Sequence, residues 1–390
     1  IKNISIVHCP IPFIEINSAY TSLFVKRLKF TCSFLSKKYL ASSRVCASCH
    51  QDIYKQWSAS IHRHAAKDPA YEKNVALLTD KKGIAATRYC EGCHAPIALL
   101  AGQLTKGGVH GGINDTPANE EGVNCISCHA TSRINNTQGV ASYHLTQERP
   151  YLFDLYNGGL NATLTKFLIR LNSSPHKNQF SVDKVNTSEF CATCHAQFMD
   201  KELNNWGWVK MQDDYSAWLS SPFSGFKEKS HSQQTVSTCQ NCHFPKVKGN
   251  DPSSDVNGFI SSHLSLGSNT FVPLHFGDID HAKKTEEFLS SGKVRVAIDV
   301  QWQKLASQDL FNTKLKNDKK TELPSYVYND QDFNFNVIVS NHFVGHDFPA
   351  GAIDLHQAWL EVTVSDHSGK IVFQSGNLNE HGDIVNSPKI

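Results

Sequence analysis

Five copies of one short pattern, Cys-x-x-Cys-His, constrain this chain more than any other feature. They take up ten of the twelve cysteines in 390 residues and begin at Cys46, Cys90, Cys125, Cys191 and Cys239. From the 12 cysteines and 20 histidines of the chain, about 0.02 such matches would be expected by chance. The spacing is that of the attachment sequence of c-type haem, so the sequence predicts five covalent haems.

The chemistry of haem attachment explains both the spacing and the histidine. Two thiols add to the two vinyl groups of the porphyrin, and the adjoining histidine reaches the iron as its proximal ligand. The predicted attachment residues are Cys46, Cys49, Cys90, Cys93, Cys125, Cys128, Cys191, Cys194, Cys239 and Cys242. The predicted proximal ligands are His50, His94, His129, His195 and His243.

Two other readings of paired cysteines fit less well. Zinc sites use two such pairs at a time, whereas five pairs cannot be shared out two by two, and zinc gives no reason for a histidine after every pair. Thioredoxin-like redox pairs need a βαβ context that this sequence does not show around them. Haem attachment is therefore the favoured interpretation.

Five haems with two axial ligands each need five ligands beyond the motifs. Methionine is the other common sixth ligand, but the chain has only Met199 and Met211. The sequence therefore predicts mostly bis-histidine, low-spin haems of low potential. Candidates for the distal position include His62 and His64 after the first motif, His176 before the fourth, His263 after the fifth, and His346. A solvated or hydrogen-bonded surface histidine is the alternative for each.

Composition agrees with a cofactor-filled interior. Hydrophobic residues make up 40% and charged residues 19% of the chain, and mean hydropathy is −0.36. Porphyrins would supply the missing apolar volume. The net charge of +2 excludes a strongly basic nucleic-acid binder.

The motif positions and the hydrophobic pattern divide the chain into four parts. Residues 1–43 are expected to be a leader or a non-native stretch, 44–265 a pentahaem cytochrome c domain, 266–292 a linker and helix, and 293–390 a β-rich domain that the chain leaves incomplete. The gaps between motifs are irregular, which excludes a solenoid. We expect mainly short α-helices and loops around five covalent haems, followed by a partial β-sandwich-like domain.

Local patterns place a few elements. Helical spacing predicts helices at 51–66 and 280–290, and the polar stretches 131–139 and 246–258 are expected to be loops. Alternation of apolar residues predicts strands at 294–300, 333–339, 359–364 and 370–374, with a hairpin turn at 366–369.

Haem attachment also indicates the compartment. In prokaryotes it takes place outside the cytoplasmic membrane, so we expect a periplasmic or extracellular protein. The sequence contains no run of 18 apolar residues, so no transmembrane helix is predicted. Residues 26–38 make a poor secretory signal. The two remaining cysteines, Cys9 and Cys32, would be spare thiols in an oxidising compartment.

Several segments resemble the multihaem cytochromes c of the hydroxylamine-oxidoreductase and nitrifier tetrahaem cytochrome group. They are CASCHQDIYKQWSASIHRHAAKDPAY at 46–71, CEGCHAPIALLAG at 90–102, EGVNCISCHA at 121–130, FCATCHA at 190–196 and VGHDFPAG at 344–351. The resemblance implies distal ligands at His62, His176 and His263, with His346 a further candidate. The roles of His64, His110, His144, His231, His275 and His346 stay open.

The leading functional hypothesis is an electron-transfer protein that relays single electrons between redox protein donors and acceptors, with the β-rich part serving docking or self-assembly. The alternative is a multihaem oxidoreductase for a small nitrogen or sulfur compound, with one five-coordinate haem and a distal pocket containing Arg88, Tyr89 or His110. A third is a structural subunit that hands electrons to a catalytic partner. The chain differs from enzymatic members of the group that it resembles: it has no Cys-x-x-Cys-Lys motif, and it has five haem motifs where hydroxylamine oxidoreductase has eight haems. The sequence therefore does not indicate a catalytic haem.

Overall fold

The computed structural model describes residues 40, 43–101, 117–145, 151–153, 155–180, 183–205, 207–226, 236–300, 335–352 and 356–385. Several features named above lie outside these residues: the stretch 1–39 with Cys9 and Cys32, and the histidines His110 and His231. None of the described helices is long and apolar enough to cross a membrane.

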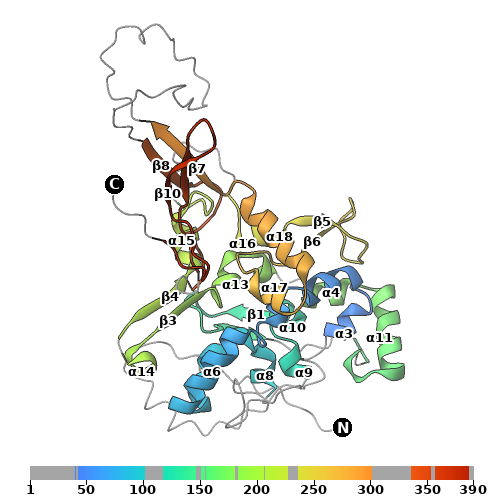
Figure 1. Ribbon diagram of the computed structural model, residues 1–390. Coiled ribbons are helices and arrows are strands. Elements are labelled where there is room, and N and C mark those ends of the chain that lie inside the picture. The colour runs from blue at the N-terminus through green and yellow to red at the C-terminus, as the bar shows by residue number, and fades with distance from the viewer. Residues whose placement is uncertain are drawn as a thin grey trace.

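Short helices dominate the part of the chain that contains the five motifs (Figure 1). They are α3 (Ser43–Ala47), α4 (Gln51–Ser58), α5 (Ile61–His64), α6 (Pro69–Lys82), α7 (Ile84–His94), α8 (Pro96–Leu100), α9 (Pro117–Glu120), α10 (Cys125–His129), α11 (Gly159–Leu171), α12 (Ser174–Phe180), α13 (Ser188–Ala192), α14 (Lys201–Asn204), α15 (Asp214–Ser220), α16 (Cys239–His243), α17 (Phe271–His275) and α18 (Ile279–Ser290), with 3-10 turns η2 (Leu155–Asn157) and η3 (Asp183–Asn186).

The first predicted helix is interrupted, and the second is confirmed. The helix expected over 51–66 stops after Ser58, and a new one starts at Ile61 because Ser60 accepts a hydrogen bond from the Arg63 amide as an N-cap. The helix expected over 280–290 is α18, which begins after Asp278, whose side chain caps the His281 amide. The break after α4 turns His62 away from the direct continuation of the first helix.

The strands form five separate antiparallel pairs. They are β1 (Thr131–Ile134) with β2 (Tyr143–Leu145), β3 (Ala196–Met199) with β4 (Val209–Asp213), β5 (Lys246–Lys248) with β6 (Phe259–Ser261), β7 (Val294–Val300) with β8 (Phe335–Asn341), and β9 (Val362–Ser365) with β10 (Ile371–Ser375). The stretches 131–139 and 246–258, expected to be loops, each begin with a short strand of such a pair. That part of the expectation is wrong.

The predicted strands after residue 293 are present with small shifts. β7 pairs with β8 over seven residues, from Val294 opposite Asn341 to Val300 opposite Phe335. β9 and β10 are joined through the expected turn, where the Asp366 carboxylate accepts hydrogen bonds from Ser368 and Lys370 amides. These strands form the arm that rises from the helical body in Figure 1. Within the described residues they make two separate pairs, so a sandwich stays a prediction.

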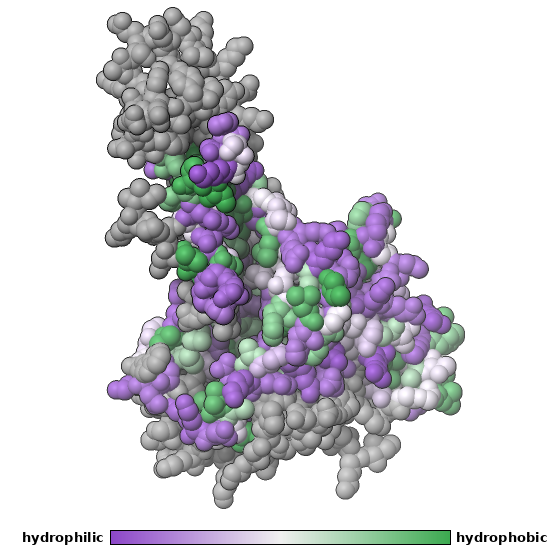
Figure 2. Space-filling model, viewed as in Figure 1, coloured by the Kyte–Doolittle hydropathy of each residue, from purple (hydrophilic) through white to green (hydrophobic). Residues whose placement is uncertain are grey.

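The apolar core is small and built largely from alanine. Its main cluster consists of Leu40, Ala66, Ala95, Ile97, Ala98, Ala101, Ala118, Ile126 and Ala130. Polar side chains cover most of the visible face of the helical body, while apolar ones gather on the arm (Figure 2).

Candidate functional site

The second, third and fifth Cys-x-x-Cys-His motifs lie on helices, and the first and fourth continue from the ends of α3 and α13 into a turn with the same hydrogen bond, which explains the common spacing. In the first motif the His50 amide donates to the Cys46 carbonyl at 2.9 Å, and in the fourth His195 makes the same bond to Cys191 at 2.8 Å. Residues three and four apart share one face of a helix. Both thiols and the imidazole therefore project from the same side of the backbone, as attachment to one porphyrin requires.

Local capping residues hold two of these turns. Before α10, Asn124 accepts from the Ser127 amide at 3.0 Å, and Ser127 in turn accepts from the Asn124 amide. Before α16, Thr238 and Asn241 make the same reciprocal arrangement. Such capping boxes stabilise helices too short to persist alone.

Four of the five motif histidines, the predicted proximal ligands, face a second histidine from a distant part of the chain. The ring centres lie 6.2 Å apart for His50 with His176, 6.3 Å for His129 with His263, 6.2 Å for His195 with His62, and 6.2 Å for His243 with His346. Three pairs are near-parallel, at 10°, 21° and 7°, and the pair of His62 and His195 is near-perpendicular, at 79°.

This distance tests whether the residues fit an iron between the rings. Metal–imidazole bonds are about 2 Å long, and a ring centre lies roughly 1 Å beyond its nitrogen, so two imidazoles on one metal have centres about 6 Å apart. The four pairs match that separation whatever the angle between their planes. The predicted distal residues His62, His176, His263 and His346 are thus each brought opposite a motif histidine. Their roles as ligands stay predictions.

Hydrogen bonds fix the orientation of most proximal rings. The Nδ1 atoms of His94, His129 and His243 donate to the carbonyls of Ala65, Phe180 and Leu266, at 3.3, 2.7 and 2.6 Å. His50 differs, because its Nδ1 donates to the Asp251 carboxylate at 2.8 Å. A bond at Nδ1 leaves Nε2 as the nitrogen available to a metal.

Burial keeps these imidazoles in the neutral form that binds metals. Desolvation, followed by the charges of His195, His243 and His263, lowers the pKa of His62 to about 3. Desolvation and the neighbouring His129 lower the pKa of His263 to about 4. Both rings are therefore neutral near neutral pH.

A glycine allows the chain to pass close to His62. Gly122 has φ of +51°, and a Cβ there would lie 2.5 Å from the Arg63 carbonyl oxygen and 2.6 Å from that of His62. The next amide, of Val123, donates to the His62 carbonyl at 2.8 Å. Only glycine fits this close approach, which ties α5 to the turn before the third motif.

Thiols of different motifs lie next to one another. Contact with the Cys125 thiol, together with burial, raises the pKa of Cys46, and Cys194 and burial do the same to Cys93. The Cys239 thiol likewise raises the pKa of Cys191. These contacts join the first motif to the third, the second to the fourth, and the fourth to the fifth.

The second motif stands apart from the other four. Within the described residues His94 faces no histidine at the separation seen in the four pairs; its ring stacks on Tyr71 with centres 4.3 Å apart and an angle of 8°. Glu91, between the two cysteines, is fully buried. Burial raises the pKa of Glu91 to about 7, although a hydrogen bond from Thr87 opposes the shift.

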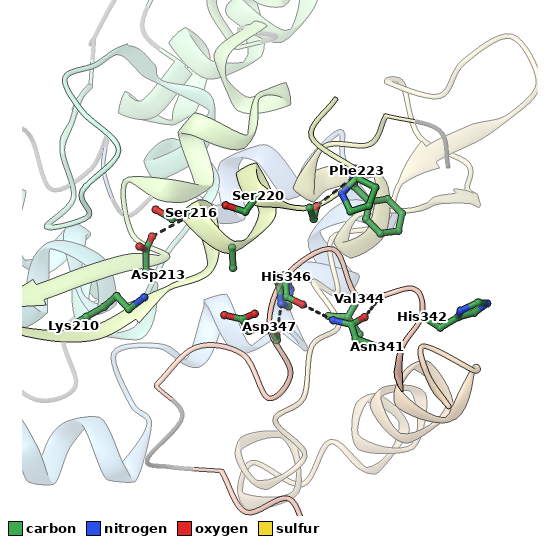
Figure 3. A pocket seen from close by; sticks show the side chains of 13 residues that line it. Lys210, Asp213, Ser216, Ser220, Phe223, Asn341, His342, Val344, His346 and Asp347 are labelled. Atoms are coloured by element: carbon green, nitrogen blue, oxygen red, sulfur yellow. Dashed lines mark hydrogen bonds between the residues drawn. The ribbon is translucent and has the colours of Figure 1, made fainter. Parts of the chain in front are cut away.

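A cavity of about 670 Å³ lies beside the fifth pair. His346 and Asp347 line one side of it, and Lys210 and Asp213 the other (Figure 3). The carbonyl of His346 accepts a hydrogen bond from Asn341 at 2.8 Å, which anchors the loop that bears it to the end of β8. A volume in this range is typical of cofactor pockets.

The remaining candidate residues have other partners or lie elsewhere. His64 stacks on Phe276 at 4.0 Å, His275 packs against Phe271 and Phe276, and His144 bonds to Arg133 and Asn135. Arg88 is exposed, and the Tyr89 hydroxyl donates to the Phe198 carbonyl. None of these side chains is placed opposite a motif histidine.

Sequence reasoning missed Asp251 and Glu91. Glu91 was visible as an acidic residue inside a Cys-x-x-Cys pair. Asp251 gave no signal, because it lies 201 residues after its partner His50 in a stretch that was read as a surface loop.

Residues 45–130 match the family model described as "Cytochrome c554 and c-prime". This range holds the first three motifs, and it resembles a c-type cytochrome, which supports covalent c-type haem there. The chain is also similar to a solved structure, the penta-heme cytochrome c552 from Thermochromatium tepidum. The two are 18% identical, the match covers 89% of this chain and 81% of the other, and the TM-score is 0.47. No curated protein matches the chain.

Proposed function

We propose that this protein is a multihaem c-type cytochrome that relays single electrons through five covalent haems between redox protein partners. One observation carries the proposal: four motif histidines each face a second histidine at 6.2–6.3 Å. Two imidazoles fill both axial positions of an iron, which suits electron transfer rather than substrate binding. When bound, each haem supplies a one-electron couple.

The protein's own residues would attach, orient and space the haems. The ten motif cysteines would hold the porphyrins, and the Nδ1 bonds of His50, His94, His129 and His243 would keep their rings oriented toward the irons. The contacts between cysteines of different motifs support short steps between haems: from the first motif to the third, and from the fourth to both the second and the fifth. The fourth motif would then be a branch point.

A location in the periplasm or outside the cell goes with this proposal, because c-type haem is attached there in prokaryotes. Its partners would be redox protein donors and acceptors. The arm formed by β7 to β10 carries exposed apolar side chains such as Val296 and Val339, at 60% and 56% exposure, which supports a part in docking or assembly.

A haem count and a spin count test the proposal. The chain is expressed with a cytochrome c maturation system, and covalent haem is measured per chain by the pyridine haemochromogen assay. We expect five haems, with bis-histidine low-spin signals in the electron paramagnetic resonance (EPR) spectrum. The near-perpendicular pair of His62 and His195 should give the most anisotropic of them. Fewer than four low-spin haems in the intact chain would contradict the proposal.

A second function is favoured by the surroundings of His94. Among the described residues no imidazole faces it, and a buried carboxyl with a pKa of about 7, that of Glu91, lies in the same motif. An iron held by His94 with an open sixth position would allow a multihaem oxidoreductase for a small nitrogen or sulfur compound. One full equivalent of high-spin iron with nitrite- or hydroxylamine-dependent turnover would favour this function over the carrier.

A further inference from the structure

The bond between His50 and Asp251 is unlike every other proximal contact among the described residues. His50 Nδ1 lies 2.8 Å from Asp251 Oδ1, and the Asp251 side chain is fully buried. The rings of His94, His129 and His243 bond instead to neutral backbone carbonyls. His195 also has a carboxylate nearby, that of Asp214, but at 3.9 Å the two are too far apart for a hydrogen bond.

Asp251 is held in place by its own turn and by the helix that follows the first motif. Its Oδ1 also accepts hydrogen bonds from the Ser253 amide at 3.0 Å and the Ser253 hydroxyl at 2.7 Å. The preceding amide, of Asn250, donates to the Asp52 carboxylate on α4 at 2.7 Å. Because Asp52 is two residues after His50, the turn and the histidine are tied to the same short segment.

The hydrogen bonds around Asp251 keep it charged. Burial raises the pKa of Asp251, but the bonds from His50 and Ser253 outweigh that effect, so its pKa lies below the usual value. Its second oxygen, Oδ2, is buried and has no hydrogen-bond partner among the described residues. A negative charge is thus fixed in a water-poor place directly behind the first proximal histidine.

Such a carboxylate acts on a bound iron in one direction. The carboxylate accepts a hydrogen bond from Nδ1–H, which makes the imidazole a stronger electron donor to the iron. Its negative charge also favours the ferric state, which carries one more positive charge than the ferrous state. Both effects lower the reduction potential. Neutral carbonyls at the other proximal rings exert them much less.

We propose that Asp251 is a positioning residue that gives the haem of the first motif the lowest reduction potential among the four bis-histidine haems. This inference rests on the proposed function and deepens it, because it assigns an order of potentials to the relay. At equilibrium, electrons would reside least on the His50 haem and pass to the haem of the third motif, its neighbour through Cys46 and Cys125.

The test is a redox titration of the complete haem-loaded protein and of Asp251→Asn, followed by EPR. The amide keeps an acceptor for His50 but removes the charge. We expect the reduction potential of one haem to rise. At a fixed ambient potential its ferrous-to-ferric ratio should increase tenfold or more, which corresponds to about 59 mV for a one-electron couple. The shifted signal should be the one lost in His176→Ala, and the other haems should not move.

Asp214→Asn is the matched control, because it removes a carboxylate that lies near a proximal histidine without bonding to it. It should produce a clearly smaller shift. An Asp251→Asn protein whose four low-spin potentials equal those of the wild type would overturn the proposal, as would an equal shift in Asp214→Asn. The wild-type haem count tests the proposed function separately, since it does not depend on any variant.

Ser253→Ala tests the effect of Asp251 on the reduction potential in case the Asp251→Asn protein does not retain its haems. This change keeps the carboxylate and removes a competing hydroxyl donor from Oδ1, so His50 would be held more strongly. The same haem should then shift to lower potential, opposite in sign to the first variant. General loosening of the site would not produce that sign, and an unchanged or raised potential would overturn the inference.

Discussion

The first and second motifs share one pattern but differ in what surrounds the histidine. His50 faces His176 and bonds to a buried carboxylate, Asp251, whose pKa is lowered. His94 stacks on Tyr71, bonds to a carbonyl, and lies near a buried carboxyl, Glu91, whose pKa is raised to about 7. Near neutral pH Asp251 is charged, whereas about half of the Glu91 carboxyl is protonated. The motif specifies the attachment site of a haem, while residues far away in sequence set the second ligand and the charge next to the motif histidine.

The largest expected effect comes from making the first site resemble the second. His176→Ala removes the imidazole 6.2 Å from that of His50. With no second ligand, the iron of the first motif should change from low to high spin, so that one whole low-spin signal is lost from the EPR spectrum. The other low-spin signals should remain.

His64→Ala is the matched control for this change. Like His176, His64 lies on a short helix, but its ring stacks on Phe276 with centres 4.0 Å apart. Its removal should leave every haem signal in place. If His176→Ala keeps all low-spin signals, or if His64→Ala loses one, the pairing of rings described above is wrong.

The second expected effect concerns Glu91 and the pH dependence of stability. Its pKa rises from 4.5 to about 7 on folding because the side chain is buried. Between pH 4.5 and 7 the folded protein holds a proton that the unfolded chain has lost. The contribution of Glu91 to the free energy of unfolding is therefore fully present below about pH 4.5 and falls as the pH rises toward 7. The difference corresponds to about 3 kcal/mol.

Glu91→Gln removes this titration and should flatten the fall in unfolding free energy between pH 4.5 and 7. Denaturant unfolding at several pH values measures it. Glu72→Gln, a change at a carboxylate in the first turn of α6, serves as the control and should leave the slope as it is in the wild type. An equally steep fall in Glu91→Gln would show that another group is responsible.

The comparison also explains what the sequence allowed to be predicted. The cysteines and proximal histidines were readable because five consecutive residues carry all the information, and one helical turn places them. α18 and β7 were readable from the periodicity of their apolar residues. The interruption after α4 was missed, because the apolar pattern continues through Ile61, whereas in the structure Ser60 caps a new helix.

Partners brought together by the tertiary fold had no such signal. His62 meets His195 across 133 positions, and His50 meets Asp251 across 201. No local spacing relates these residues. Ligand counting gave only a set of candidate distal histidines, from which the resemblance singled out His62, His176 and His263, and Asp251 was not named at all. The strand pairs β1–β2 and β5–β6 were missed for a related reason. Their strands are only three or four residues long, too short for alternation to stand out from a polar loop.

The smallest expected effect probes how the first site is held. Asp52 accepts the Asn250 amide and lies in the first turn of α4, where a negative charge also stabilises the helix. Asp52→Asn weakens a charge-assisted bond, so we expect a loss of about 1 kcal/mol in unfolding free energy. The turn that carries Asp251 would loosen, and the first haem should shift slightly to higher potential, by less than in Asp251→Asn. Asp280→Asn removes a comparable first-turn charge, on α18, together with its ion pair to Lys284. It should lower stability too, but it should leave the potential of the first haem unchanged. A shift at the second haem in Asp52→Asn would break the comparison, because nothing in the described residues links Asp52 to His94.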